Sequence, residues 1–155
     1  MSAPKRKEWE LSGSINFYES PVHMYGANFE QNITGDDYLN LIRTEFLIEQ
    51  SSINETFADA LDIDFSNGEI KTSNFTNCGI NSGNGDCLDF SGSVVDIKNV
   101  VIRNASDKAI SVGEETYSTI SKTKITEAKI GIASKDSSSV IGEKRRLIAV
   151  ASGFQ

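Results

Sequence analysis

The stretch Leu61-Asp62-Ile63-Asp64-Phe65-Ser66-Asn67-Gly68 returns, nearly copied, as Leu88-Asp89-Phe90-Ser91-Gly92. In both copies apolar and acidic residues alternate, and a Ser/Gly turn follows. Alternation with a period of two is typical of a strand that buries one face. The repetition predicts that the chain is assembled from copies of one strand-and-turn unit.

One apolar position recurs at a regular interval along the chain. With Leu61 as the reference, it is occupied by Ile15, Leu39, Leu61, Leu88, Ile110, Ile132 and Phe154. Subtracting successive numbers gives steps of 24, 22, 27, 22, 22 and 22 residues. A period of about 20 to 29 residues indicates a solenoid, in which each unit buries its apolar face by stacking on its neighbours.

Three further columns accompany the first. The second column, nine or ten residues later, holds Met24, Ile70, Ile97, Ile120 and Ile141; the third holds Phe29, Phe75, Ile102, Ile125 and Leu147; and a fourth, of small residues, holds Ser51, Cys78, Ala105 and Ala128. The coil that starts at Leu39 reaches Ile48 in nine residues and does not match the second column cleanly. The columns predict three short strands in each coil.

Leucine-rich repeats share this period but require closely spaced leucines and a helical return limb. The return limbs here, such as residues 70–75 and 97–102, are β-branched and polar, with no helical stripe. The sequence therefore predicts an all-β fold, a single-stranded right-handed parallel β-helix of about six coils of 22–27 residues. Residues 1–14 are expected to form an N-terminal entry or cap, and residues 15–155 the β-helix. One open interpretation of the last coil is that the natural solenoid is longer and is truncated at Gln155.

Charge and hydropathy exclude two classes of partner. Fifteen basic against 22 acidic residues give a net charge of −7, which argues against nucleic acid. No apolar run approaches the roughly 20 residues that span a bilayer, so we expect no membrane span. The basic start at residues 1–7 has no apolar stretch behind it and is not a signal peptide. A monomer or an end-to-end oligomer is expected.

Cys78 and Cys87 leave two states open. Cys78 lies in the small-residue column, and Cys87 lies in another column with Ala60, Ala109 and Gly131. A disulfide would close the loop between them, but a bridge needs close Cβ geometry, so two buried thiols are favoured.

Two long loops, residues 52–58 and 79–85, occur in successive coils and match at Ile53/Ile80 and Asn54/Asn81. Insertions on one side of successive coils commonly wall a binding groove. We therefore expect a groove beside the strands that begin near Leu61 and Leu88.

Five carboxylates gather on these two coils: Asp59, Asp62, Asp64, Asp86 and Asp89. Stacking places Asp62 about 5 Å from Asp89, and like charges that close are costly unless a cation bridges them or one is protonated. Asp62 and Asp89 are therefore the candidate calcium ligands and the candidate catalytic pair. The competing interpretation is a solvated or hydrogen-bonded Asp ladder, with Asp59 and Asp86 as turn residues. No other cofactor is expected.

Lys71 and Lys98 form a separate outward ladder on the second strand of each coil. They can neutralise part of the acidic face or bind an acidic sugar, so they join the candidate ligand-binding residues. A solvated lysine pair is the alternative.

Several segments resemble right-handed parallel β-helix repeats of bacterial surface and secreted proteins, of the pectate-lyase-like superfamily in fold. They are residues 19–22, 64–68, 107–114 and 130–136, and the likeness covers roughly residues 14–140. The resemblance implies the fold, an extracellular or cell-surface location and, in some relatives, enzymes that act on acidic polysaccharides. The Arg-Pro and Asn-Thr-Asp signatures of those enzymes are absent, so no catalytic role is carried over.

Three functions remain open. The leading hypothesis is a non-catalytic β-solenoid surface module that binds carbohydrate or acts as a scaffold. The second is a polysaccharide lyase or glycoside hydrolase that uses the Asp59/Asp62/Asp89 region, since paired carboxylates are the usual machinery of glycoside cleavage. The third is a fragment of an oligomeric viral fibre.

Overall fold

The chain forms a β-solenoid in a computed structural model that describes residues 5–6, 9–143 and 148–150. The described residues include no helix, and hence none that could cross a membrane. The short strands β1 (Lys5–Arg6) and β2 (Trp9–Glu10) pair antiparallel, and every other strand pair is parallel. The predicted all-β parallel β-helix is confirmed. The assignment of residues 1–14 to a cap stays a prediction.

Each coil contributes one strand to each of three faces. The first face contains β3 (Gly13–Tyr18), β6 (Asp37–Ile42), β9 (Asp59–Asp64), β12 (Leu88–Ser91) and the second halves of β14 (Val101–Gly113) and β16 (Lys124–Ser134). The second face contains β4 (Val22–Tyr25), β7 (Glu45–Glu49), β10 (Asn67–Lys71), β13 (Val94–Lys98), β15 (Tyr117–Ser121) and β17 (Ser139–Gly142). The third face contains β5 (Asn28–Glu30), β8 (Ser52–Asn54), β11 (Asn74–Cys78), the first halves of β14 and β16, and β18 (Ile148–Val150).

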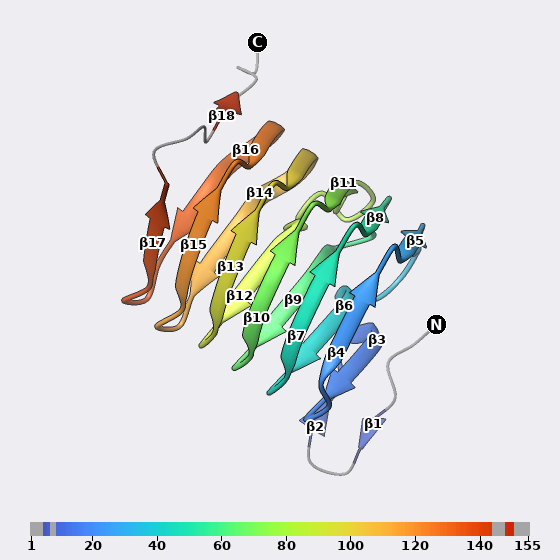
Figure 1. Cartoon of the computed structure of the whole chain (residues 1–155). Coiled ribbons are helices and arrows are strands. Elements are labelled where there is room, and N and C mark those ends of the chain that lie inside the picture. Colours follow the sequence, from blue (N-terminus) through green and yellow to red (C-terminus); the bar gives the residue numbers. More distant parts are fainter. Residues whose placement is uncertain (1–4, 7–8, 144–147, 151–155) are drawn as a thin grey trace.

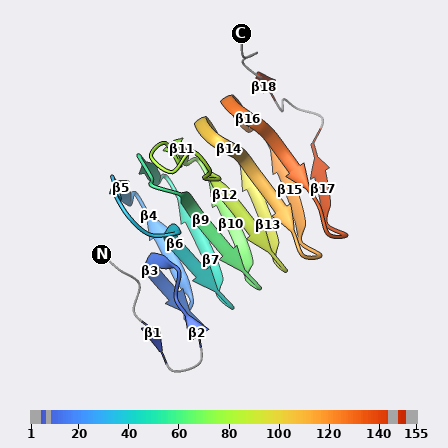
Figure 2. The same cartoon turned by 180° about the vertical axis from the view of Figure 1, so that it is seen from behind.

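The second face lies in front in Figure 1, and the first face is seen in the reverse view of Figure 2. The coils follow one another in chain order, from blue strands at one end to red strands at the other (Figure 1). Because β14 and β16 run through the corner between the third and first faces, these two faces form one continuous ten-stranded sheet.

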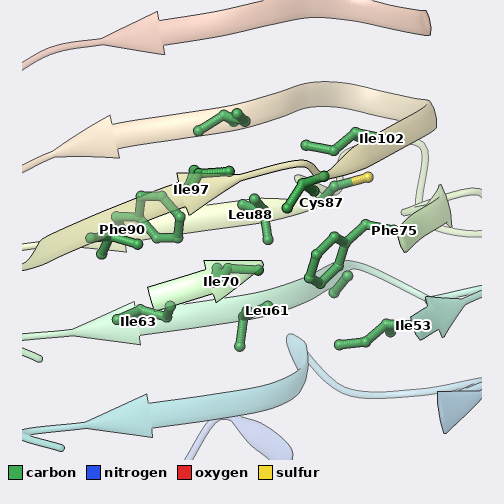
Figure 3. Close-up of a cluster of buried hydrophobic side chains, with 14 of the residues drawn as sticks. Ile53, Leu61, Ile63, Ile70, Phe75, Cys87, Leu88, Phe90, Ile97 and Ile102 are labelled. Atoms are coloured by element: carbon green, nitrogen blue, oxygen red, sulfur yellow. The ribbon is translucent and has the colours of Figure 1, made fainter. Parts of the chain in front are cut away.

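The core is made of the predicted apolar columns. Leu39, Leu61, Leu88 and Ile110 are in register on adjacent strands and are at most 1% exposed. Figure 3 shows Leu61, Leu88 and Ile70 within the cluster of buried side chains. Each coil buries its apolar side chains against those of the next coil, and this is what stabilises a solenoid.

Three column assignments are wrong, and register corrects them. Ile48 pairs with Met24 and Ile70, so the Leu39 coil does fit the second column. Ile141 pairs with Thr119 and is 46% exposed, while Val140 packs against the core. A shift of one residue turns a side chain to the opposite face of a strand, which explains the exchange.

Ser51 is not in the small-residue column of Cys78, Ala105 and Ala128. The pairing of Asn54 with Thr76 puts Thr56 in the Cys78 position instead. Ser51 belongs to a buried hydroxyl column at another corner, where its backbone N–H donates to Ser73 Oγ at 3.2 Å. The predicted column members Leu147 and Phe154 lie outside the described residues.

Each described corner of the solenoid turns through at least one residue in the left-handed region, and through two at Glu114–Glu115 and Asp136–Ser137. The three columns of such residues are Glu19, Arg43, Phe65, Gly92, Glu114 and Asp136; Gly26, Gln50, Thr72, Asn99 and Lys122; and Gln31, Glu55, Asn77, Asn104 and Glu127. This conformation costs a non-glycine residue roughly 1–2 kcal/mol. Backbone bonds to the next coil offset the cost, as from Arg43 N–H to the Asp64 carbonyl at 2.9 Å.

In the two sequence copies, residues 61–68 and 88–92, the leucines are in register on adjacent strands but the phenylalanines are not. Ile63 pairs with Phe90, and both are fully buried. Phe65 instead occupies a corner beside Gly92 and is 55% exposed. A Cβ on Gly92 would lie 2.5 Å from the Phe65 ring, so glycine is needed where the ring crosses the next coil.

Candidate acidic binding site

The candidate site lies on the outward side of the first face, at the start of β9 and β12. Two columns of polar side chains run across the coils there. One holds Asp37, Asp59, Asp86 and Lys108, and the other holds Asn40, Asp62, Asp89 and Ser111. The predicted register of Asp62 beside Asp89 is confirmed. Alternation with the buried Leu61 and Ile63 directs Asp62 outward.

Three carboxylates form a compact group at the corner. Asp59, Asp86 and Asp89 each offer an oxygen, and these oxygens lie within 4.8 Å of one another. Asp59 and Asp86 are close because the Asp86 backbone N–H donates to Asp59 Oδ1 at 2.7 Å. Asp62, which the sequence analysis paired with Asp89 for calcium, is adjacent but is not one of the three. The group has the all-oxygen character that suits a hard divalent cation.

The three carboxylates line a pocket of about 340 Å³. Its other lining residues are Asp36, Ala58, Asn84, Asp107, Lys108 and Lys135. The pocket thus presents carboxylate, amide and ammonium groups from five successive coils. A polar ligand, rather than an apolar one, fits such a lining.

Lys108 neutralises part of the acidic charge. Its Nζ lies 3.1 Å from Asp86 Oδ2 and 2.6 Å from Asp107 Oδ2. The hydrogen bond from Lys108 lowers the pKa of Asp107, and Lys129 adds an ion pair to Asp107 at 3.5 Å. Burial acts to lower the pKa of Lys108, but its bonds to Asp107 and Asp86 outweigh this and raise the pKa. Lys108 therefore stays charged and bound to two of the acids.

Three carboxyl groups of this face, those of Asp37, Asp59 and Asp62, hold their protons unusually tightly. Burial raises the pKa of Asp59 to about 7, against the bond from Asp86 N–H and with help from the neighbouring Asp charges. Burial, with the charges of Asp37 and Asp64, raises the pKa of Asp62 to about 9. Burial also raises the pKa of Asp37 to about 6. Without a counter-charge, this face is therefore partly protonated at neutral pH.

The pKa values of Asp64 and Asp86 are also raised, in both cases chiefly by burial. The Asn40 side chain partly offsets this at Asp64, where its Nδ2 lies 3.4 Å from Oδ2. Asp64 marks the far end of β9 from Asp59. The acidic groups therefore extend along the whole strand.

Several buried oxygen atoms on the same face lack a partner within the described part of the chain. They are Asp37 Oδ2, Asn40 Oδ1 and Ser111 Oγ, from residues that are 4%, 0% and 0% exposed. The side-chain Nδ2 of Asn40 donates to Asp62 Oδ2 at 2.6 Å, whereas the side-chain Oδ1 of Asn40 has no hydrogen-bond donor among the described residues. Unpaired buried oxygens are uncommon in folded proteins, and these three add to the polar, electron-rich character of the face.

Cys78 and Cys87 form a disulfide with a Cα–Cα distance of 5.2 Å, so the favoured expectation of two thiols is wrong. Stacking brings the two columns together at the corner where the third face meets the first, which sequence spacing did not reveal. The bridge closes the insertion at residues 79–86, seen beside β11 in Figure 1.

The expected match between the two long loops is also wrong. Ile53 is buried in β8 and pairs with Phe75, whereas Ile80 is 42% exposed in the insertion. The shorter loop, residues 55–58, still packs beside the insertion, because the Ser82 N–H donates to the Phe57 carbonyl at 3.1 Å. Ala58 and Asn84, one from each loop, line the pocket. The loops therefore form a wall of the site.

Lys71 and Lys98 are in register on β10 and β13, so the predicted ladder is confirmed. They belong to the second face and line no part of the acidic pocket. Lys71 pairs with Glu49 at 3.4 Å and Glu69 at 3.7 Å. The ion pairs of Lys71 and the exposure of Lys98 favour a solvated ladder.

The fold brings together Asp59, Asp86 and Asp89, with Asp62 and Asp64 further along the same strands. Sequence reasoning missed Asp37, Asp107 and Lys108. A signal for two of them was present, because Asp37 and Lys108 stand two residues before Leu39 and Ile110, as Asp59 stands before Leu61.

The fold and the site define this chain as a parallel β-solenoid with an acidic pocket on one face. No protein-family model, no curated protein and no solved structure matches it.

Proposed function

We propose that this chain is a non-catalytic binding module whose acidic site holds a divalent cation, Ca²⁺ in preference, and a carbohydrate bound through it. The observation that carries the proposal is the grouping of Asp59, Asp86 and Asp89, with oxygens within 4.8 Å of one another. Three carboxylates that close repel one another unless protons or a cation neutralise them. A cation removes that cost and provides affinity.

The chemistry of the donors favours Ca²⁺. This ion takes six to eight oxygen ligands in flexible geometry, whereas Mg²⁺ demands a near-ideal octahedron. The three carboxylates would hold the ion, and none of the residues lining the pocket offers a sulfur or imidazole ligand. Three carboxylates leave coordination positions for other oxygen ligands.

A carbohydrate suits those positions. The hydroxyl groups of a sugar can coordinate Ca²⁺, and Asn84 and Lys135 on the pocket lining can hydrogen-bond to others. The resemblance to β-helix proteins of bacterial surfaces supports the same ligand class. The disulfide supports an oxidising compartment, such as the cell exterior.

Calorimetric titration with CaCl₂, followed by thermal melts, tests the cation site. We expect saturable binding and a melting temperature that climbs with Ca²⁺ by mass action. Asp89→Asn should abolish both effects, whereas Asp96→Asn, on the exposed side of β13, should change neither. Equal Ca²⁺ response in wild type and Asp89→Asn would rule the site out. A glycan array run with Ca²⁺ and with chelator then tests the carbohydrate.

A glycoside hydrolase is the second candidate, and the raised pKa of Asp59 favours it. With a pKa of about 7, Asp59 can supply a proton near neutral pH, as a general acid does. Its distance from Asp89 is closer to the roughly 5 Å of retaining enzymes than to the roughly 6.5–9.5 Å of inverting ones. Release of reducing ends from a polysaccharide, lost in both Asp59→Asn and Asp89→Asn, would favour the enzyme.

A further inference from the structure

We propose that the Cys78–Cys87 disulfide sets the cation affinity of the acidic site, so that the site is complete only in protein that folded under oxidising conditions. The inference rests on the proposed function, since it concerns the regulation of the same site. It assigns to the two cysteines a positioning role, and neither sulfur contacts the ion.

The first step of the argument is adjacency. Cys87 directly follows Asp86, one of the three clustered carboxylates. Its sulfur is bonded to Cys78, which lies at the end of β11 in register with Ala105. The disulfide thus ties the residue beside Asp86 to the ladder of the third face.

The second step is the network that the tether holds in place. The insertion at residues 79–86 contacts both neighbouring coils: the Gly79 N–H donates to Thr56 Oγ1 at 3.1 Å, and the Gly85 N–H donates to Ser106 Oγ at 2.9 Å. At its end, the Asp86 N–H donates to Asp59 Oδ1 at 2.7 Å. Displacement of Asp86 would therefore also disturb Asp59.

The third step is what reduction does to this corner. A dithiol gives two electrons and two protons to the bridge: the S–S bond breaks, two S–H bonds form, and the dithiol becomes a disulfide. Bonded sulfurs lie about 2 Å apart, whereas non-bonded heavy atoms need roughly 3.5–4.0 Å. Both cysteines are 0% exposed, so the close-packed corner has no free space for the separation.

The backbone must absorb that separation. Cys78 lies within the ladder between β11 and β14. Cys87 is also bonded to both neighbouring coils: its N–H donates to the Lys108 carbonyl at 3.0 Å, and its carbonyl accepts from the Leu61 N–H at 3.2 Å. Asp86 belongs to the same ladder, because its carbonyl accepts from the Ala60 N–H at 2.9 Å. Movement of Cys87 therefore distorts the ladder that also holds Asp86, and the carboxylates of Asp86 and Asp59 lose their common geometry.

The fourth step concerns access. Because neither cysteine has exposed surface, a reductant cannot reach the bridge while this corner stays folded. The redox state is therefore fixed when the chain folds. Native oxidised protein should keep its Ca²⁺ affinity in millimolar dithiothreitol, whereas protein refolded from denaturant with dithiothreitol should not regain it.

The experiment compares three preparations by CaCl₂ calorimetry and circular dichroism: oxidised wild type, wild type refolded in dithiothreitol, and Cys78→Ala/Cys87→Ala. We expect the last two to keep the β-sheet spectrum and to bind Ca²⁺ about tenfold more weakly or worse, as is typical when a supporting group of a metal site is lost. Val100→Ala is the control: it removes buried side-chain volume at a different corner, and should lower the melting temperature while leaving Ca²⁺ affinity unchanged.

A reciprocal measurement keeps the proposal testable if a variant folds poorly. If the disulfide tightens Ca²⁺ binding tenfold, Ca²⁺ must favour the disulfide tenfold, lowering by about 30 mV the reduction potential of protein refolded from denaturant in a dithiothreitol redox buffer. Equal Ca²⁺ affinity in oxidised and reduced protein overturns the inference. So does a reduction potential of the disulfide that is the same with and without Ca²⁺. Oxidised wild type that binds no Ca²⁺ overturns the proposed cation site instead.

Discussion

Asp62 lies beside Asp89 on the adjacent strand, while its Oδ2 accepts a 2.6 Å hydrogen bond from Asn40 on the other side. Burial and the charges of Asp37 and Asp64 raise the pKa of Asp62 to about 9. Asp62 is therefore protonated in the folded protein at neutral pH, although it is ionised in the unfolded chain. That difference destabilises the fold in the absence of a cation.

Replacing Asp62 with asparagine should stabilise the cation-free protein at pH 7. Asparagine has nearly the same shape, keeps an oxygen for Asn40, and does not lose a charge on folding. We expect the free energy of unfolding in chelator to rise by roughly 2 kcal/mol, or about 4–8 °C in melting temperature. Differential scanning calorimetry measures this, and a lower melting temperature in chelator would contradict it. Asp96→Asn, on the second face, is the matched control and should have little effect.

The stability of the cation-free protein should fall as pH rises from about 4 to about 7. Burial raises the pKa of Asp59 from 3.8 to about 7 and that of Asp37 from 3.8 to about 6. The folded state therefore binds these protons more tightly, so their contribution is complete below pH 4 and is lost as pH rises through these values. Each group adds a slope of up to about 1.4 kcal/mol per pH unit.

Urea denaturation in chelator between pH 4.5 and pH 7.5 measures this slope. The window stays above the lowered pKa values of Asp107 and Glu49, whose stabilisation is lost only at more acidic pH. Saturating Ca²⁺ should flatten or reverse the slope, since the ion competes with protons for the same carboxylates. Stability that rises with pH in chelator would mean that these carboxyl groups are not buried as described.

Lys108→Met should destabilise the protein and increase its response to Ca²⁺. The change removes the cation from Asp86, which is 5% exposed, and from Asp107. Loss of one partner from a buried pair costs about 3–5 kcal/mol, and the partial exposure of Lys108 reduces this to roughly 2 kcal/mol. Ca²⁺ titration of the melting temperature checks both effects. Lys98→Met, an exposed lysine on the second face, should stay within about 0.5 kcal/mol of wild type.

Thr72→Gly should stabilise the protein by about 0.5–1 kcal/mol. Thr72 is exposed at a corner with a φ of 50°, where a β-branched side chain is strained. Relief of roughly 1–2 kcal/mol outweighs the roughly 0.5–1 kcal/mol of added chain entropy. Thr126→Gly, within β16, should destabilise the protein instead. Thr126 does not have a positive φ, so glycine relieves no backbone strain there and only adds chain entropy. A drop in melting temperature for Thr72→Gly would contradict the corner geometry.

The corners show how far local sequence reasoning reaches. Asn77, Asn99 and Asn104 occupy left-handed positions, which asparagine tolerates, and such sites can be anticipated from residue type. Phe65 and Thr72 occupy equivalent positions against their local preference. Stacking on the adjacent coil overrides the preference there, and no property of the residue alone indicates it.

The architecture was predictable from the amino-acid pattern alone. Alternation around Leu61 and Leu88, repeated at intervals of about 22 residues, leaves one apolar face per unit that only an identical neighbouring unit can bury. Register follows from the same pattern, since a slip of one residue would turn Leu61 outward and Asp62 inward. The pairing of Asp62 with Asp89 was predictable for this reason.

The composition of the site, in contrast, depends on how the loops pack in the folded protein. The grouping of Asp59, Asp86 and Asp89 lies at a corner, where strand periodicity ends and the path of the loops sets side-chain positions. The Lys108 ion pairs and the Cys78–Cys87 bridge likewise depend on how the insertion folds back between coils. Periodicity specifies which side chains share a face, but distances of a few ångströms between corner residues arise from loop packing, which has no period in the sequence.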